Sequence, residues 1–284
     1  MLNHESMMET IIHIGEDKLF LRHNRVIPGR RTLLFVHGLG ETGACFREVF
    51  QDRRFDEFNL LAPDLVGYGK SSRPHPDGRG FDAHVQRLWK LLEKYEIHNL
   101  ILIGHSMGGD ITTLMCAADS QGIIKKYVNI EGDVTQFDLT FSSKAVEAEE
   151  KENFLTWFRE DFMITTVLKK LGERFPTSAQ RYYEALRQCD PNAFLANARE
   201  LVKRNKNLSL PGDYKSEIGQ VYAGLSLPRI YCYGTLSLSE GEGTLGFLKE
   251  KRLDIMSFEN AGHWVMIDKV AEFYSFLHEF VARV

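Results

Sequence analysis

The sequence is short of cysteine and of long apolar runs. Its 4 cysteines, Cys45, Cys116, Cys189 and Cys232, lie far apart and form no C-x-x-C pair. This spacing excludes a disulfide framework and a zinc site of the usual kind. No H-E-x-x-H or similar ligand spacing occurs either, so we expect no metal. No apolar stretch approaches the roughly 20 residues that span a bilayer.

The charge of the chain excludes a second group of functions. The 35 basic and 39 acidic residues leave a net charge of −4, and no basic stripe is present. Nucleic acid and anionic membranes are therefore not expected as partners. Residues 1–10 are polar and contain no apolar segment of a secretory signal. We expect a cytoplasmic protein that acts on a small-molecule substrate, while the oligomeric state stays open.

Strand and helix patterns alternate over most of the chain. A β-hairpin is predicted at 10–14 and 18–22, and short apolar runs predict strands at 32–36, 58–62, 99–103, 126–130, 229–233 and 253–258. Helices are expected at 81–95, 107–118, 243–251 and 265–281. Such alternation is typical of an α/β fold, with a mostly parallel central sheet and helices on both faces.

The alternation is interrupted between about residues 133 and 227. This segment has helical stretches rich in aromatic residues, at 144–171, 179–188 and 191–204. A helical insertion of this kind predicts a cap over the sheet, inserted after the strand that ends near Ile130. We assign residues 1–133 and 228–284 to the core domain and 134–227 to the cap. Five apolar side chains could line its inner face and contact substrate, or only pack the cap onto the core: Phe154, Trp157, Phe158, Phe162 and Met163.

The strongest chemical signal is the G-x-S-x-G pattern at residues 104–108, between a predicted strand and a predicted helix. A serine at the apex of this tight turn is strained, with its hydroxyl exposed above the sheet. The flanking glycines leave room where a Cβ would clash. The start of the following helix adds N–H donors and the positive end of a dipole. Ser106 is therefore the predicted nucleophile.

A serine hydroxyl needs a base and a site for the developing negative charge. His263 follows the last predicted strand, which places it at the same carboxyl edge of the sheet as Ser106. Two backbone N–H groups follow from the turns as the oxyanion hole. One belongs to Met107, directly after the nucleophile, and the other to the loop after Val36, where we choose Leu39.

Two neighbours of these residues are further candidates. His105 precedes the predicted nucleophile and Trp264 follows the predicted base, and we place both among the substrate contacts. His105, like His37, also lies inside a turn motif, where a structural role is the alternative.

A glycine pattern at 38, 40 and 43 also matches the dinucleotide-binding fingerprint. The acidic residue that this motif needs about 20 positions further on falls at Asp64, inside a second glycine turn. A weak P-loop pattern at 69–71 lacks the first glycine, since Asp64 stands there. Neither motif explains Ser106 or His263, so no cofactor is predicted.

In their order, these pieces resemble the α/β-hydrolase superfamily, and in particular its capped serine esterase-like members. The matching pieces are the His37-Gly38 turn, the D-x-x-G-x-G-x-S stretch at 64–71, the Ser106 turn and the Gly262-His263 loop. The resemblance implies a serine hydrolase that cleaves a small to medium, largely apolar carboxylic ester or lactone. Hydrolysis of a thioester, an amide or a C–C bond stays open, as does a non-catalytic ligand-binding member of the fold.

The chain departs from the family pattern at the catalytic acid. The family usually carries an aspartate after the strand represented here by 229–233, but this sequence has Ser237 at that place. Some members carry the acid one strand earlier, where Glu131 directly follows Ile130. The resemblance therefore assigns the acid to Glu131, with Asp133 as the second choice and Glu240 as the third.

Overall fold

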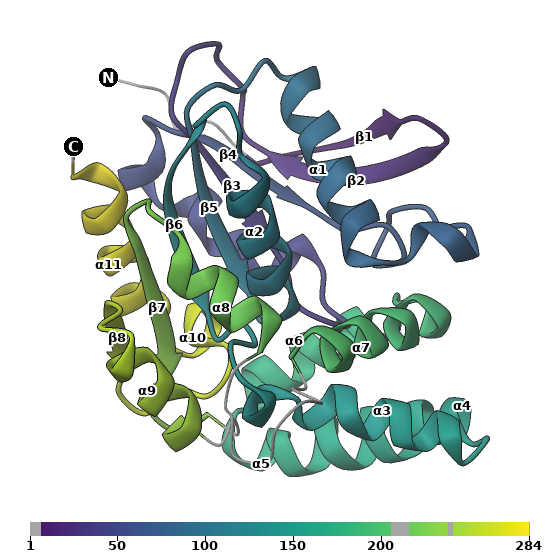
Figure 1. The fold of residues 1–284 in the computed structure, drawn as a ribbon. Helices are drawn as coiled ribbons and strands as arrows, with labels where there is room; N and C mark the ends of the chain where they lie inside the picture. The colour runs from purple at the N-terminus through teal and green to yellow at the C-terminus, as the bar shows by residue number, and fades with distance from the viewer. Residues whose placement is uncertain (1–6, 206–215, 238–240, 284) are drawn as a thin grey trace.

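A computed structural model describes residues 7–205, 216–237 and 241–283. An eight-stranded sheet in the order β1-β2-β4-β3-β5-β6-β7-β8 forms its centre (Figure 1). The strands are β1 (Met8–Ile14), β2 (Asp17–His23), β3 (Thr32–Val36), β4 (Asn59–Pro63), β5 (Leu100–His105), β6 (Ile124–Ile130), β7 (Arg229–Gly234) and β8 (Ile255–Phe258). The hairpin β1–β2 and the β2–β4 pair are antiparallel, and the remaining pairs are parallel. The predicted α/β fold is confirmed.

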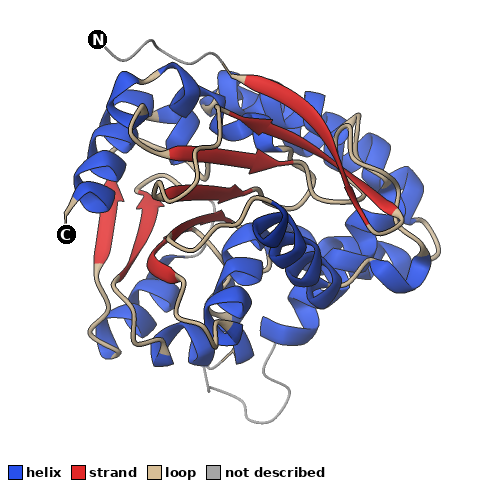
Figure 2. Cartoon of the chain, turned by 90° about the horizontal axis from the view of Figure 1, so that it is seen from above, coloured by secondary structure: helices blue, strands red, loops and turns tan. Residues whose placement is uncertain are grey.

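Helices cover both faces of the sheet (Figure 2). On the face toward the viewer in Figure 1 lie α1 (Phe81–Lys94), α2 (Met107–Ala118) and α8 (Glu217–Gly224). The 3₁₀ helix η1 (Gly43–Gln51) and helix α11 (Val270–Ala282) lie behind the sheet, and α9 (Gly241–Glu250) lies beside β8. Every residue of β3, β4 and β5 is buried, as expected for strands that are covered on both sides.

Between β6 and β7 the chain forms a run of helices beyond the carboxyl ends of the strands (Figure 1). They are η4 (Gln136–Asp138), α3 (Thr140–Glu150), α4 (Phe154–Thr156), η5 (Trp157–Leu171), α5 (Gly172–Arg174), α6 (Pro176–Leu186) and α7 (Pro191–Asn205). This is the segment that the sequence marks as an insertion. Its division from the core at residues 133/134 and 227/228 stays a prediction.

Two predicted helices are broken in the structure. The stretch 144–171 leaves its helix at Glu152, which has a positive φ of 56°, and resumes as α4 and the π-helical η5. The stretch 265–281 divides at Lys269 into α10 (Val265–Asp268) and α11. In each case the apolar spacing of the sequence continues, although the helix itself is interrupted for a few residues.

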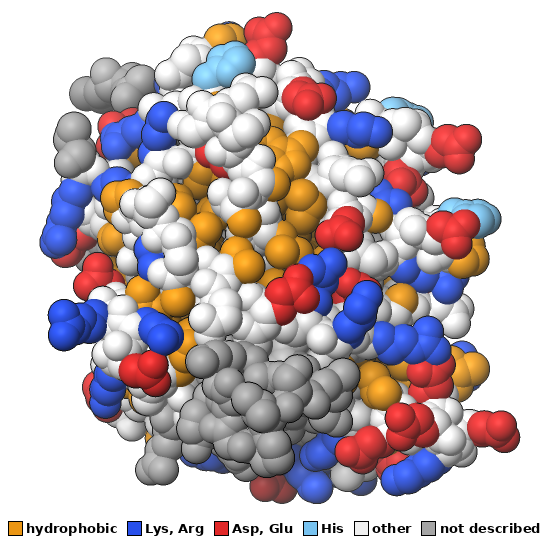
Figure 3. Space-filling model, in the orientation of Figure 1, with side chains coloured by type: hydrophobic (Ala, Val, Ile, Leu, Met, Phe, Trp, Pro, Cys, Tyr) orange, Lys and Arg blue, Asp and Glu red, His pale blue; other side chains and the backbone are white. Residues whose placement is uncertain are grey.

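Acidic and basic side chains are interspersed on the face shown in Figure 3. Among the described residues, no helix is both long and apolar enough to cross a membrane.

Candidate active site

Ser106 occupies the sharp turn between β5 and α2. Its backbone lies in the left-handed region, with φ 51° and ψ −127°, and its N–H donates to Ile130 O at 2.8 Å. A Cβ on Gly104 would lie 2.5 Å from Gly108 O, and one on Gly108 would lie 2.1 Å from Val36 O. Only glycine fits at these two places, so the strand, the turn and the helix pack as the motif requires. The serine is thereby held in a backbone conformation that non-glycine residues rarely adopt.

His263 and Glu131 come together at the ends of two other strands. His263 lies between β8 and α10, and its Nδ1 is 2.7 Å from Glu131 Oε2. Glu131 directly follows β6, and its Oε1 accepts the Gly234 N–H at 2.8 Å. The Ser237 hydroxyl donates to Glu131 Oε2 at 2.5 Å. The serine that stands in place of the usual aspartate therefore hydrogen bonds to the carboxylate that the sequence analysis names as the acid.

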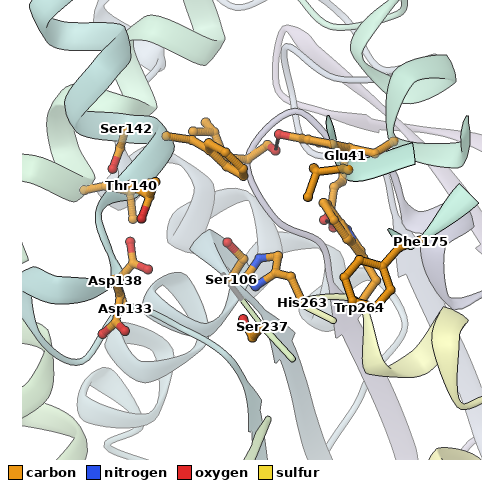
Figure 4. A pocket seen from close by; sticks show the side chains of 15 residues that line it. Glu41, Ser106, Asp133, Asp138, Thr140, Ser142, Phe175, Ser237, His263 and Trp264 are labelled. Carbon is orange, nitrogen blue, oxygen red and sulfur yellow. Dashed lines mark hydrogen bonds between the residues drawn. The ribbon is translucent and has the colours of Figure 1, made fainter. Parts of the chain in front are cut away.

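The contact with Glu131 sets the state of the His263 ring. A carboxylate at Nδ1 favours the tautomer with hydrogen there, which leaves Nε2 as a proton acceptor. Burial lowers the pKa of His263, whereas the charge and hydrogen bond of Glu131 raise it. The effects that raise it prevail, so the pKa lies above 6.5. Ser106 and His263 both line one pocket (Figure 4).

The loop after β3 passes directly against Ser106. A Cβ on Gly38 would lie 2.9 Å from the Cβ of Ser106. Within the described residues, neither the Leu39 N–H nor the Met107 N–H has a hydrogen-bond acceptor. Tyr182 of α6 donates its hydroxyl to Leu39 O at 2.9 Å, which fixes the loop from the side of the inserted helices. The arrangement suits the two predicted oxyanion donors.

Glu41 is a residue that the sequence analysis missed. Its carboxylate, with the residue 3% exposed, accepts hydrogen bonds from Gly38 N at 2.8 Å and from His105 Nδ1 at 3.0 Å. The indole N–H of Trp264 donates to its other oxygen. These three donors belong to the loop after β3, the turn before Ser106 and the loop of His263. The Glu41 carboxylate is therefore hydrogen bonded to all three segments that carry the site.

Both ring nitrogens of His105 have a partner. Its Nδ1 faces the Glu41 carboxylate, and its Nε2 faces the carbonyl oxygen of His263 at 3.0 Å. The carbonyl oxygen can only accept, so Nε2 carries a hydrogen. Burial raises the pKa of Glu41, but the charge and hydrogen bond of His105 and the Gly38 N–H lower it to about 2. His105 and Glu41 form a buried hydrogen-bonded pair.

The pocket around Ser106 encloses about 760 Å³ of empty space, including its open mouth. Of the predicted substrate contacts, Trp264 lines this pocket, whereas His105 does not. His105 is fully buried with both nitrogens occupied, so we reassign it from substrate contact to the support of the loops.

The predicted aromatic contacts from the inserted helices pack elsewhere. Phe154, Trp157, Phe158, Phe162 and Met163 are absent from the described lining of the pocket. Trp157 stacks on Phe162 with ring centroids 5.1 Å apart, and Phe158 meets Phe194 of α7 at 4.9 Å. We therefore reassign these side chains to packing among the helices, which is the alternative that the sequence left open. The aromatic lining comes instead from Phe141, Phe175, Tyr182 and Trp264.

The two alternative acids have different outcomes. Asp133 lines the pocket, but no hydrogen bond joins it to His263 in the described part of the chain. Glu240 lies outside the described residues.

Comparisons with known proteins identify the family of the chain. A family model described as the α/β hydrolase fold matches residues 31–270. Lipase 1 of Psychrobacter immobilis is 25% identical over 269 residues, which cover 90% of this chain and 78% of the lipase. A hydrolase of Bacillus subtilis and a Mycobacterium bovis protein match over only 36% and 26% of their own lengths.

Solved structures extend the likeness over the whole fold. An N-acyl homoserine lactonase complexed with N-butanoyl homoserine has a TM-score of 0.75 at 18% identity, covering 96% of each chain. An esterase from Exiguobacterium antarcticum has a TM-score of 0.74 at 16% identity, covering 97% of this chain and 100% of its own. At such identities the likeness shows a shared fold. Since the family model covers most of its sequence, the chain belongs to the α/β-hydrolase fold family.

Proposed function

We propose that this protein is a serine hydrolase that cleaves a small to medium, largely apolar carboxylic ester or lactone. The observation that carries the proposal is the Glu131–His263 contact of 2.7 Å in a pocket that also holds the strained Ser106. The aromatic and aliphatic side chains that line the pocket beside a few polar groups suit a largely apolar ligand. We propose no metal or cofactor for the reaction, and the predicted cytoplasmic location stays a prediction.

The first half of the reaction forms an acyl-enzyme. Ser106 Oγ attacks the substrate carbonyl carbon while His263 Nε2 takes the hydroxyl proton. The Glu131 carboxylate stabilises the imidazolium, and the N–H groups of Leu39 and Met107 donate to the oxyanion. The tetrahedral intermediate then collapses, the C–O bond of the ester breaks, and His263 gives its proton to the leaving alcohol. In a lactone this alcohol stays attached to the acyl group.

The second half uses water in place of serine. His263 takes a proton from the water as its oxygen attacks the acyl carbon. Collapse of the second intermediate breaks the bond to Ser106 Oγ, which recovers its proton from His263, and the carboxylic acid leaves. The same groups could act on a thioester, an amide or a C–C bond. The carbonyl of an ester is a better electrophile than that of an amide, and an alkoxide is a better leaving group than the carbanion of a C–C cleavage, so the thioester is the nearest alternative.

The absence of the usual aspartate once favoured a second candidate, a non-catalytic ligand-binding protein. The hydrogen bonds of Glu131 remove that argument, since a carboxylate does reach the histidine from the neighbouring strand.

The test is turnover of p-nitrophenyl butyrate together with labelling by a fluorophosphonate probe. We expect the wild-type protein to hydrolyse the ester, and Ser106→Ala to lower kcat/KM by at least about 10³-fold. Mass spectrometry should find the probe on the peptide that contains Ser106. Ser120→Ala removes an exposed hydroxyl and is the matched control. Wild-type protein that neither turns over the ester nor takes the probe would favour the non-catalytic candidate.

A further inference from the structure

The pocket has two unlike walls (Figure 4). On one side of Ser106 and His263 lie aromatic side chains, including Phe175 and Trp264. On the other side the labelled side chains are all polar: Asp133, Asp138, Thr140 and Ser142. A substrate whose carbonyl lies at Ser106 therefore meets aromatic rings in one direction, with Glu41 bonded to the Trp264 indole, and the labelled carboxyl and hydroxyl groups in the other.

Asp133 is the unusual member of the polar wall. It is only 6% exposed and lines the pocket. Its backbone N–H donates to Asp110 Oδ1 at 2.9 Å, but within the described residues its carboxyl group has no hydrogen bond or ion pair. Its carboxyl oxygens are not fully enclosed by the protein, and because the residue lines the pocket, a ligand there could supply the hydrogen bond that the protein does not. Asp133 is one of the residues that line the pocket shared with Ser106 and His263.

The other acidic groups near Asp133 are held by their own partners. Asp110 accepts the side-chain amide of Asn205 at 2.7 Å. Asp138 accepts the N–H groups of Val134 and Thr135 and the hydroxyl of Thr244. These bonds position the acids around Asp133 without supplying it with a donor.

Within the described lining, His263 is the group that can carry a positive charge, and its Nδ1 is taken by Glu131. The described lining contains neither lysine nor arginine. Arg204 is the cation that acts on Asp110, and it is paired with Glu200, Glu217 and Asp82. Burial raises the pKa of Asp133, and the charges of Asp110, Asp138 and Glu131 raise it further. A ligand cation would relieve both the missing hydrogen bond and the repulsion.

We propose that Asp133 binds a protonated amine of the substrate, so that preferred substrates carry an ammonium group on one side of the scissile carbonyl and an apolar group on the other. This inference rests on the proposed hydrolase function. An ammonium group has three donors, and the polar wall offers the Asp133 carboxylate and the hydroxyl groups of Thr140 and Ser142. Where Asp133 is protonated in the free enzyme, binding releases that proton to the solvent. A neutral hydroxyl would supply a hydrogen bond but leave the like charges unrelieved.

Three rigid esters of similar size test the proposal. They are phenyl 4-(aminomethyl)benzoate, phenyl 4-(hydroxymethyl)benzoate and phenyl 4-ethylbenzoate, which place an ammonium, a hydroxyl or a methyl group at the same position. The rigid ring prevents the amine from attacking its own ester. For the wild-type protein near pH 7.5, we expect kcat/KM for the aminomethyl ester to exceed that for the ethyl ester by about tenfold or more.

Variants locate the preference. Asp133→Asn should bring the ratio of the two kcat/KM values close to 1, while Asp77→Asn, which removes a fully solvated carboxylate, should leave the ratio at its wild-type value. The wild-type ratio stands without any variant, so a folding defect in Asp133→Asn does not remove the test. A melting curve of each variant identifies such a defect.

The outcomes separate this inference from the proposed function. A wild-type protein that hydrolyses p-nitrophenyl butyrate but prefers the ethyl ester, or treats the three esters alike, overturns the ammonium site alone. Equal preference for the hydroxymethyl and aminomethyl esters over the ethyl ester shows a neutral hydrogen-bonding site and also overturns it. A protein that hydrolyses no ester, p-nitrophenyl butyrate included, overturns the proposed function and this inference with it.

Discussion

Glu41 and Asp133 are both buried acids on walls of the same pocket, at 3% and 6% exposure, yet their surroundings are opposite. Glu41 has three hydrogen-bond partners, one of them the His105 ring, and its pKa falls to about 2. The Asp133 carboxyl has no partner within the described residues, and its pKa rises well above 3.8. Burial disfavours the charge on both, so the partners decide the outcome. The protein itself supplies hydrogen-bond partners to Glu41, whereas we propose that a ligand supplies them to the carboxyl group of Asp133.

The largest expected effect concerns a third acid, Glu131, which contacts His263, the proposed base. Glu131→Gln should lower kcat for p-nitrophenyl butyrate by about 10³- to 10⁴-fold, because the amide no longer stabilises the imidazolium of His263. Glu93→Gln, on the exposed face of α1, is the control.

The pH profile adds a second measurement on the same variant. His263 must be neutral to act as a base, so kcat/KM should rise with pH through an apparent pKa above 6.5. Loss of the Glu131 charge should move this rise to lower pH. An unchanged rate and pH profile in Glu131→Gln would show that another residue is the catalytic acid. Glu131 would then have no better claim to that role than Asp133.

The next effect breaks the Glu41 side of the comparison. Glu41→Gln keeps the shape of the side chain but removes the negative charge that faces His105 Nδ1. The carbonyl of His263 and the N–H of Gly38 then lose their fixed positions, and a displacement of about 1 Å near the reacting atoms costs about 100-fold in rate. We expect this loss in kcat, with little change in KM. Wild-type kcat in Glu41→Gln would show that the carboxylate only fills space.

The smallest expected effect is on stability, where the two acids should respond to pH with opposite sign. The folded-state pKa of Glu41 is lowered from 4.5, so its stabilisation is complete above pH 4.5 and is lost as the pH falls toward 2. Glu41→Gln should therefore lower the free energy of unfolding at pH 7 by about 3 kcal/mol, and by less at low pH.

The folded-state pKa of Asp133 is raised, so the carboxyl costs stability once the pH exceeds its ordinary value of 3.8. Asp133→Asn should increase the free energy of unfolding at pH 8, and the gain should disappear below about pH 4. Urea unfolding of both variants at several pH values measures the two slopes. Slopes of the same sign would remove the difference between the regions.

The sequence predicted the elements that are buried on both sides most closely. The limits of β3 and α2 agree with the prediction to the residue, because their apolar runs end at turns with glycine. Helices η1 and α8 were not predicted, since their apolar spacing is short and lies between stronger signals. The pattern of 144–171 gave a single helix because side-chain periodicity does not register a local change of backbone winding.

The site was predictable where a motif fixes a backbone shape and not where distant side chains meet. The turn around Ser106 follows from the steric needs of its glycines, and the place of His263 follows from the strand that precedes it. Glu41 has partners from three separate segments, so no local pattern marks it. The aromatic residues between β6 and β7 failed for a related reason, because hydrophobicity does not distinguish a side chain that packs from one that lines a cavity.

The pairing of β6 with β7 has a consequence for how chains of this architecture are compared. Ile130 is aligned with Cys232, so the ends of the two strands are adjacent, and a side chain from either can approach one imidazole ring. The fold thus has two neighbouring strand ends, and a carboxylate on either one can contact the histidine. An alignment column that lacks an aspartate is then a poor reason to label a sequence inactive until the neighbouring column has been inspected. Here Ser237, which stands where the aspartate is usual, donates a hydrogen bond to the Glu131 carboxylate and so orients it.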